Sequence, residues 1–226
     1  MMLTAFAIAA TLALTPTVQE EESQLMPPAG YAGRPPERDI AAPPDKDMPS
    51  IIAVSPGTVA DRFTIVPDYP RDGHVKVIGA FAITPHADVR LKNAWGPGFL
   101  PTTLLFSDGR CYLLEADYYN HALSNGRLSP ESCDGKRYDE KPSSAAPDNS
   151  GLHFIDAAWG YSVWEKTDGS VTVTAPDAKD FTPLFSAKMH VLAITAINGP
   201  DYPGGNVTLI GAIDGQLMVI ILDVGF

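Results

Sequence analysis

The residues best suited to metal binding or acid–base catalysis are five histidines, some of which lie close to carboxylates in the sequence. The segments His86–Asp88 and His153–Asp156 each place an Asp near an imidazole. Residues two apart in a strand share a face, so His86 and Asp88 point the same way if that segment is a strand. A metal ion needs a third and a fourth ligand from other segments. The pattern therefore assigns no metal ligand and no cofactor.

Sequence motifs of common enzyme classes are missing from the chain. It contains no GxSxG nucleophile elbow, no phosphate-binding Walker loop, no dinucleotide fingerprint and no HExxH zinc motif. The nearest approach is Gly160-Tyr-Ser-Val-Trp164, which lacks the second glycine and falls in an expected strand. No catalytic residue is assigned, and the question whether the protein is an enzyme stays open.

Two cysteines, Cys111 and Cys133, are the only ones in the chain. An even number of cysteines in an exported protein predicts a disulfide bond. The alternative is two unrelated buried thiols. The chain has no CxxC pair and no Cys/His cluster, so redox and structural zinc sites lack their usual signature.

The span between the cysteines carries side chains suited to recognition. These include Tyr118, Tyr119, His121 and Asn125. Aromatic and hydrogen-bonding groups concentrated in a restrained segment are typical of binding surfaces. We therefore expect a binding surface at these four residues. The alternative is a disulfide-closed surface loop whose tyrosines fold back onto the core.

The amino terminus predicts export. Residues 3–14 form an uncharged run of small or apolar residues, which fits the hydrophobic region of a secretory signal better than a membrane anchor. We expect residues 1–18 to be a signal peptide; the alternatives are an uncleaved short anchor or a start codon placed too early. No later segment offers the ~20 apolar residues of a spanning helix, so no integral membrane span is expected in the mature chain. The expected location is periplasmic or secreted.

Charge and composition narrow the range of partners. The formal net charge is −11, from 27 acidic and 16 basic residues. Nucleic acids and anionic membranes attract basic surfaces, so no nucleic-acid partner is expected.

Residues 19–50 are rich in proline and poor in large apolar side chains, which predicts a disordered or semi-rigid spacer. Residues 51–226 are expected to form a single β-rich domain.

Hairpin signals dominate this domain. Asp-Gly pairs at 108–109, 168–169 and 214–215 each separate two apolar or β-branched runs, and we expect a type I′ turn at each. Further strands are expected at Arg62–Val66, Val75–Thr84, Val89–Ala94 and Met189–Ile197.

Patterns within single segments add four expectations. The run Leu217–Leu222 is apolar on both faces and predicts a central, covered strand, whereas Ser170–Ala175 alternates and predicts one solvated face. Short helices are expected at Pro56–Phe63 and Asp117–Leu123, where Asp117 resembles an N-cap and Asn125-Gly126 a terminator. The expected fold is mainly β, an antiparallel sandwich or partly open barrel with one or two short helices.

These observations favour an exported, non-catalytic domain that binds a protein, a glycan or an envelope component. One alternative is a hydrolase or metal-dependent enzyme with a site assembled across strands. The other is a small outer-membrane β-barrel, because the last strand carries apolar residues at every second position and ends on Phe226. Against that barrel, the intervening residues Leu217, Val219 and Ile221 are apolar too.

Overall fold

The computed structural model describes residues 47–65, 74–96, 100–119, 122–134, 141–142, 144–176, 180–198 and 204–225. The expected signal peptide (1–18) and the spacer (19–50) as far as residue 46 lie outside these residues, as does His121. The chain divides into two units after Ala42, and the described residues all belong to the second unit. In the ranges given, no helix has the length and the apolar character needed to cross a membrane.

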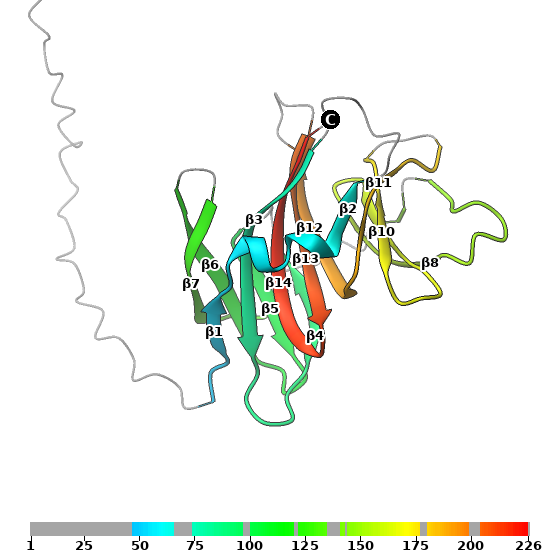
Figure 1. Ribbon diagram of the computed structural model, residues 1–226. Coiled ribbons are helices and arrows are strands. Elements are labelled where there is room, and N and C mark those ends of the chain that lie inside the picture. The colour runs from blue at the N-terminus through cyan, green and yellow to red at the C-terminus, as the bar shows by residue number, and fades with distance from the viewer. Residues whose placement is uncertain are drawn as a thin grey trace, which may run out of the picture. The chain divides into compact units, whose positions relative to one another are not determined.

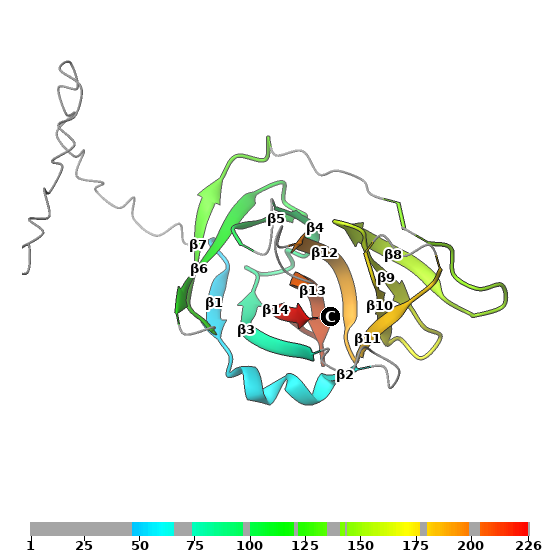
Figure 2. The same ribbon diagram turned by 90° about the horizontal axis from the view of Figure 1, so that it is seen from above.

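Strands of three antiparallel sheets make up most of the described chain (Figures 1 and 2). Sheet A contains, in spatial order, β1 (Ser50–Ala53), β3 (His74–Thr84), β14 (Gln216–Gly225), β13 (Gly204–Ile213) and β12 (His190–Asn198). Sheet B contains β2 (Phe63–Ile65), β11 (Pro183–Ala187), β10 (Val171–Thr174), β9 (Tyr161–Glu165) and β8 (His153–Ala158). Sheet C contains β4 (Leu91–Trp95), β5 (Thr102–Phe106), β6 (Cys111–Tyr119) and β7 (Ala122–Glu131). The mainly β prediction is confirmed.

Sheet A is the middle layer, and β14 shows why. Ile220 and Leu222 belong to the apolar cluster that sheet A shares with sheet B. Val219 and Ile221, which point the other way, belong to the cluster shared with sheet C. Successive strand residues face opposite sides, so a strand covered on both sides must be apolar at every position. The predicted central strand is thereby confirmed, and Figure 2 shows β14 between the other two sheets.

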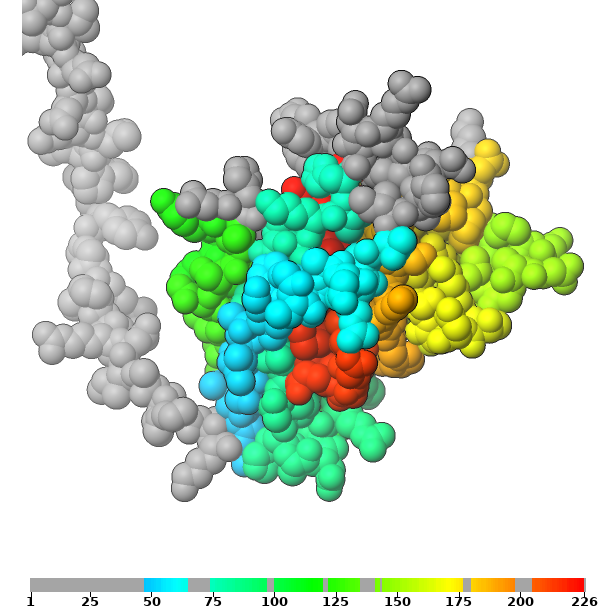
Figure 3. All heavy atoms as spheres, in the orientation of Figure 1, coloured from blue at the N-terminus to red at the C-terminus, as the bar shows by residue number. Residues whose placement is uncertain are grey.

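A short crossing segment connects sheet A to sheet B. It contains the 3-10 turns η1 (Pro56–Thr58) and η2 (Ala60–Arg62), and it leads from β1 in sheet A to β2 in sheet B. Figure 3 shows this cyan segment lying across the surface of the fold. The helix expected at Pro56–Phe63 is therefore two 3-10 turns, with Pro56 at the first helical position of η1, where a missing N–H costs nothing.

The three Asp-Gly hairpins form, although only one has the predicted turn. At Asp214-Gly215 both φ angles are positive, 50° and 82°, and Ile213 pairs directly with Gln216, as a type I′ turn requires. At Asp108-Gly109 and Asp168-Gly169 only the glycine has a positive φ. In these two turns the Asp side chain instead accepts the backbone N–H of the residue two positions further on. This local hydrogen bond favours a three-residue loop.

The prediction of a helix at Asp117–Leu123 is wrong. Residues 117–119 end β6, and Leu123 lies in β7, paired with Tyr118. Leu123 is buried and packs against Gly79 in β3, where a side chain on the glycine would collide with it. This tertiary contact and the pairing with β7 override the local helix signals. Asn125 has a φ of 49°, the conformation expected of a helix terminator, but it lies within β7.

The prediction that one face of Ser170–Ala175 is solvated is also wrong. Thr172 and Thr174 are buried, at 4% and 0% exposure, together with the valines between them. Trp164 lies opposite Thr172 in the register and packs edge-on against Phe154 and Phe181. These three aromatic side chains cover the outer face of sheet B. The alternation of polar and apolar residues within one strand does not reveal that the face is covered.

Candidate functional site

The predicted disulfide between Cys111 and Cys133 is present, and its Cα atoms are 5.4 Å apart. It joins the first residue of β6 to the segment that follows β7. The enclosed span is therefore a β-hairpin of sheet C, where the sequence indicated a surface loop. A disulfide at the open end and backbone pairing along its length both restrain this hairpin.

Tyr118 and Tyr119 occupy the far end of the hairpin, and both are exposed, at 53% and 75%. Tyr118 pairs with Leu123, whose side chain packs onto sheet A, so Tyr118 lies on the inner face of the hairpin. Tyr119 pairs with Ala122 and lies on the outer face. The two rings therefore stand on opposite faces of the hairpin. Figure 1 shows this end of β6 and β7 on the side of the fold away from sheet B.

Charged side chains brace the strands below the tyrosines. Arg127 in β7 contacts Glu115 Oε2 at 3.3 Å and Asp117 Oδ1 at 3.1 Å, both in β6. The amide of Asn125 donates to Asp117 Oδ2 at 3.1 Å. Hydrogen bonds from Asn125 and then Arg127 lower the pKa of Asp117, and the hydrogen bond to Asp117 raises the pKa of Arg127. Asn125, one of the four residues expected to bind, therefore holds Asp117 through its side-chain amide. His121, another of the four, lies outside the described residues.

The histidine–aspartate pairs do not form the arrangement that a metal ion needs. His86 and Asp88 lie in the β3–β4 connection rather than in a strand. His86 Nε2 is 3.7 Å from Asp47 Oδ1. His153 is exposed, whereas Asp156 is buried and accepts the backbone N–H of Ile194 at 2.9 Å. Over the whole described portion, no group of three His, Cys, Asp or Glu side chains comes close enough to hold a metal ion.

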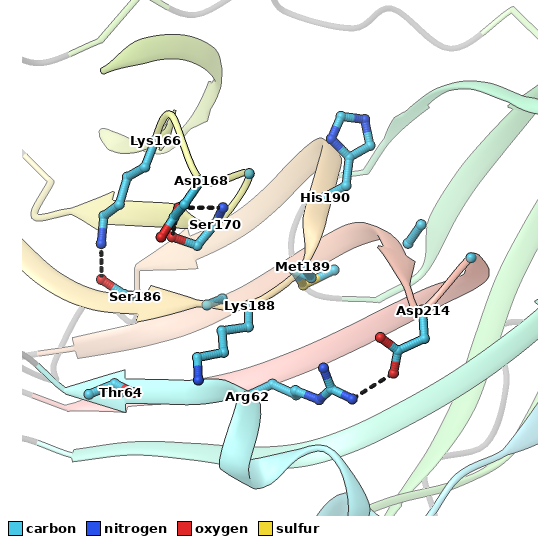
Figure 4. Close-up of a pocket in the computed structure, with 14 residues that line it drawn as sticks. Arg62, Thr64, Lys166, Asp168, Ser170, Ser186, Lys188, Met189, His190 and Asp214 are labelled. Carbon is cyan, nitrogen blue, oxygen red and sulfur yellow. Dashed lines mark hydrogen bonds and ion pairs between the residues drawn. The ribbon is translucent and has the colours of Figure 1, made fainter. Parts of the chain in front are cut away.

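A second candidate site, which the sequence did not indicate, is an open groove of about 730 Å³ at one end of sheets A and B (Figure 4). Its walls come from η2 and β2, from the β9–β10 and β13–β14 turns, and from the chain that passes from β11 to β12. Three cationic side chains line it, Arg62, Lys166 and Lys188. The chain is acidic overall, so three cations in one groove are a local reversal of its charge.

Each cation is held differently. The Arg62 guanidinium donates to Asp214 Oδ2 at 2.6 Å, and Lys166 Nζ donates to Ser186 Oγ at 2.9 Å. The backbone N–H of Lys188 donates to the Arg62 carbonyl at 2.9 Å, which joins the two walls. Within the described residues, the Lys188 ammonium has no hydrogen-bond acceptor.

Two further groups shape the edge of the groove. Asp168 accepts hydrogen bonds from the backbone N–H and the hydroxyl of Ser170, which lower its pKa. His190 Nδ1 lies 3.2 Å from Glu165 Oε1. The hydrogen bonds from Ser170 stabilise the ionised form of Asp168, so this carboxylate counts as a negative charge beside the cations.

The sequence carried no signal for this groove. Arg62, Lys166 and Lys188 lie far apart in the chain, each among residues of ordinary composition. Only the crossing from sheet A to sheet B and the return from β11 to β12 bring them together.

No protein-family model, curated protein sequence or solved structure matches this chain.

Proposed function

We propose that the protein is an exported, non-catalytic binding domain that works in the periplasm or outside the cell. The disulfide between Cys111 and Cys133 is consistent with an oxidising, extracytoplasmic compartment. The observation that carries the binding proposal is the exposure of Tyr118 and Tyr119 on opposite faces of one hairpin end. Tyrosines bury large areas on binding and are frequent anchors of protein interfaces.

The placement of the two rings favours a concave protein partner. A flat surface reaches only one face of a hairpin, so it buries one ring at most. A groove or pocket that receives the hairpin end contacts both rings at once. We therefore propose a protein partner, in preference to a glycan or another envelope component, and insertion of the hairpin into it.

Restraint of the hairpin supports this role. The disulfide, the cross-strand pairing and the contacts of Arg127 with Glu115 and Asp117 hold the tyrosines in place before a partner arrives. A segment that is already ordered loses less conformational entropy on binding, so more of its contact energy appears as affinity.

Tyr119→Ala separates a binding role from a structural one. About a quarter of this side chain is buried, roughly 50 Å² of surface, so the variant is expected to lose about 1 kcal/mol of folding stability. As an anchor, the same residue is expected to contribute about 2 kcal/mol to binding, a roughly 30-fold change in affinity. Urea unfolding measures the first quantity.

The binding arm uses a photo-cross-linking amino acid placed at position 119 in the protein's host cells. We expect one discrete protein adduct from position 119 and none from position 92, an exposed lysine in β4 of the same sheet. Equal adduct patterns from both positions would contradict the proposal. A loss of more than about 3 kcal/mol of stability in Tyr119→Ala would assign the ring to the fold instead.

A further inference from the structure

The groove at the end of sheets A and B has the properties of an anion site (Figure 4). Bringing Arg62, Lys166 and Lys188 to one groove costs repulsion between like charges, which a bound anion relieves. Lys188 is the most available of the three, because its ammonium is exposed and has no acceptor among the described residues. The backbone that carries this side chain is held at the groove, because the Lys188 N–H donates to the Arg62 carbonyl at 2.9 Å.

The charges lining the groove suit a singly charged group. Three cationic side chains face two carboxylates, those of Asp168 and Asp214, which leaves one net positive charge. Asp214 already holds the Arg62 guanidinium at 2.6 Å. A phosphate dianion brings more negative charge than this balance accommodates and meets repulsion from both carboxylates. A carboxylate brings the one charge that is needed.

The remaining lining and the size of the groove indicate what accompanies the carboxylate. Hydroxyl groups of Thr64, Ser170 and Ser186 line the same space and can exchange hydrogen bonds with ligand hydroxyls. A volume of about 730 Å³ lies in the range of sites for drug-sized ligands and exceeds the need of a bare ion. The combination of cations and hydroxyls matches a compound that carries both a carboxylate and several hydroxyls.

We infer that this groove binds an acidic sugar, with the carboxylate of a uronic acid unit at the Lys188 ammonium and its hydroxyls against the serine and threonine side chains. The inference does not depend on the hairpin, which belongs to sheet C, whereas the groove lies at sheets A and B. Either proposal can therefore fail without the other.

The test is calorimetric titration of the purified protein with a trimer of galacturonic acid at low ionic strength. Binding is expected with the acidic trimer and not with the neutral galactose trimer. Raising the salt to about 150 mM is expected to weaken it, because an exposed ion pair is screened. The variant Lys188→Ala is expected to bind about tenfold more weakly, the effect of one charge-assisted contact.

Two variants keep the result interpretable. Lys188→Gln retains most of the aliphatic stem without the charge and is expected to show the same loss as Lys188→Ala. Lys92→Ala removes the same charge from an exposed position in sheet C and is expected to bind like the unchanged protein. Absence of binding to the acidic trimer, equal binding of the neutral trimer, tighter binding of inorganic phosphate, or an unchanged affinity in both Lys188 variants would each overturn the inference.

Discussion

Asp156 is the side chain whose replacement tests how sheet B is attached to sheet A. It lies on β8, is 4% exposed, and accepts the backbone N–H of Ile194 in β12 at 2.9 Å. β8 and β12 are the terminal strands of their sheets in the described fold. A terminal strand has N–H groups with no further strand to bond, and a buried N–H needs an acceptor. The carboxylate supplies that acceptor.

The loss of folding stability on removing the Asp156 carboxylate follows from this geometry. Asp156→Ala leaves the Ile194 N–H buried and unpaired, which costs about 1–3 kcal/mol, and the missing carboxyl group leaves a small void. We expect a total loss of about 3 kcal/mol. Asp156→Asn has the same shape and keeps an oxygen acceptor while losing the charge. Hydrogen bonds to neutral acceptors are weaker than those to charged ones, so this variant is expected to lose about 1 kcal/mol.

Urea unfolding with the disulfide intact, followed by tryptophan fluorescence, measures both values. The control is Asp88→Ala, an exposed carboxylate in the β3–β4 connection, which is expected to change stability by less than about 0.5 kcal/mol. If Asp156→Ala were as stable as the control, the carboxylate would not join the two sheets.

Two further predictions concern the hairpin. Replacing Cys111 and Cys133 by Ser opens a loop with a sequence separation of 22 and is expected to cost about 3 kcal/mol in urea unfolding; a loss below about 1 kcal/mol would show that strand pairing alone closes it. Hydrogen bonds from Asn125 and Arg127 hold the pKa of Asp117 below its ordinary value of 3.8, so their contribution to stability is present above that value and is lost as the pH falls through the lowered pKa. Arg127→Ala is expected to raise the pKa of Asp117 toward 3.8 in an NMR titration of the carboxyl carbon, and an unchanged pKa would remove Arg127 as its partner.

Local patterns in the sequence determined much of the fold. An apolar residue at every position of Leu217–Leu222 indicated a strand covered on both faces, and β14 is that strand. Three Asp-Gly pairs located three hairpins, because a glycine accepts the positive φ that each turn requires. The two cysteines indicated the disulfide that is observed. The strand and turn signals are each contained in a few neighbouring residues, whereas the disulfide signal needs only the number of cysteines in the chain.

Tertiary structure decided what depends on segments distant in the chain. The cap-like residues of Asp117–Leu123 favoured a helix, but pairing with β7 and the contact of Leu123 with Gly79 impose a strand. Thr172 alternates with valines as a half-solvated strand does, yet Trp164 from the neighbouring strand covers it. Periodicity reports which side chains share a face and says nothing of what packs on that face.

The same distinction applies to the two candidate sites. The restrained span with Tyr118 and Tyr119 could be found from the sequence, because its residues lie between two cysteines. The sequence did not determine that both rings would be exposed on opposite faces, which follows from the register of β6 and β7 at the end of sheet C. The groove of Arg62, Lys166 and Lys188 exists only where the chain crosses between sheets A and B. Charges converge through the topology of the whole chain, and no local pattern records that convergence.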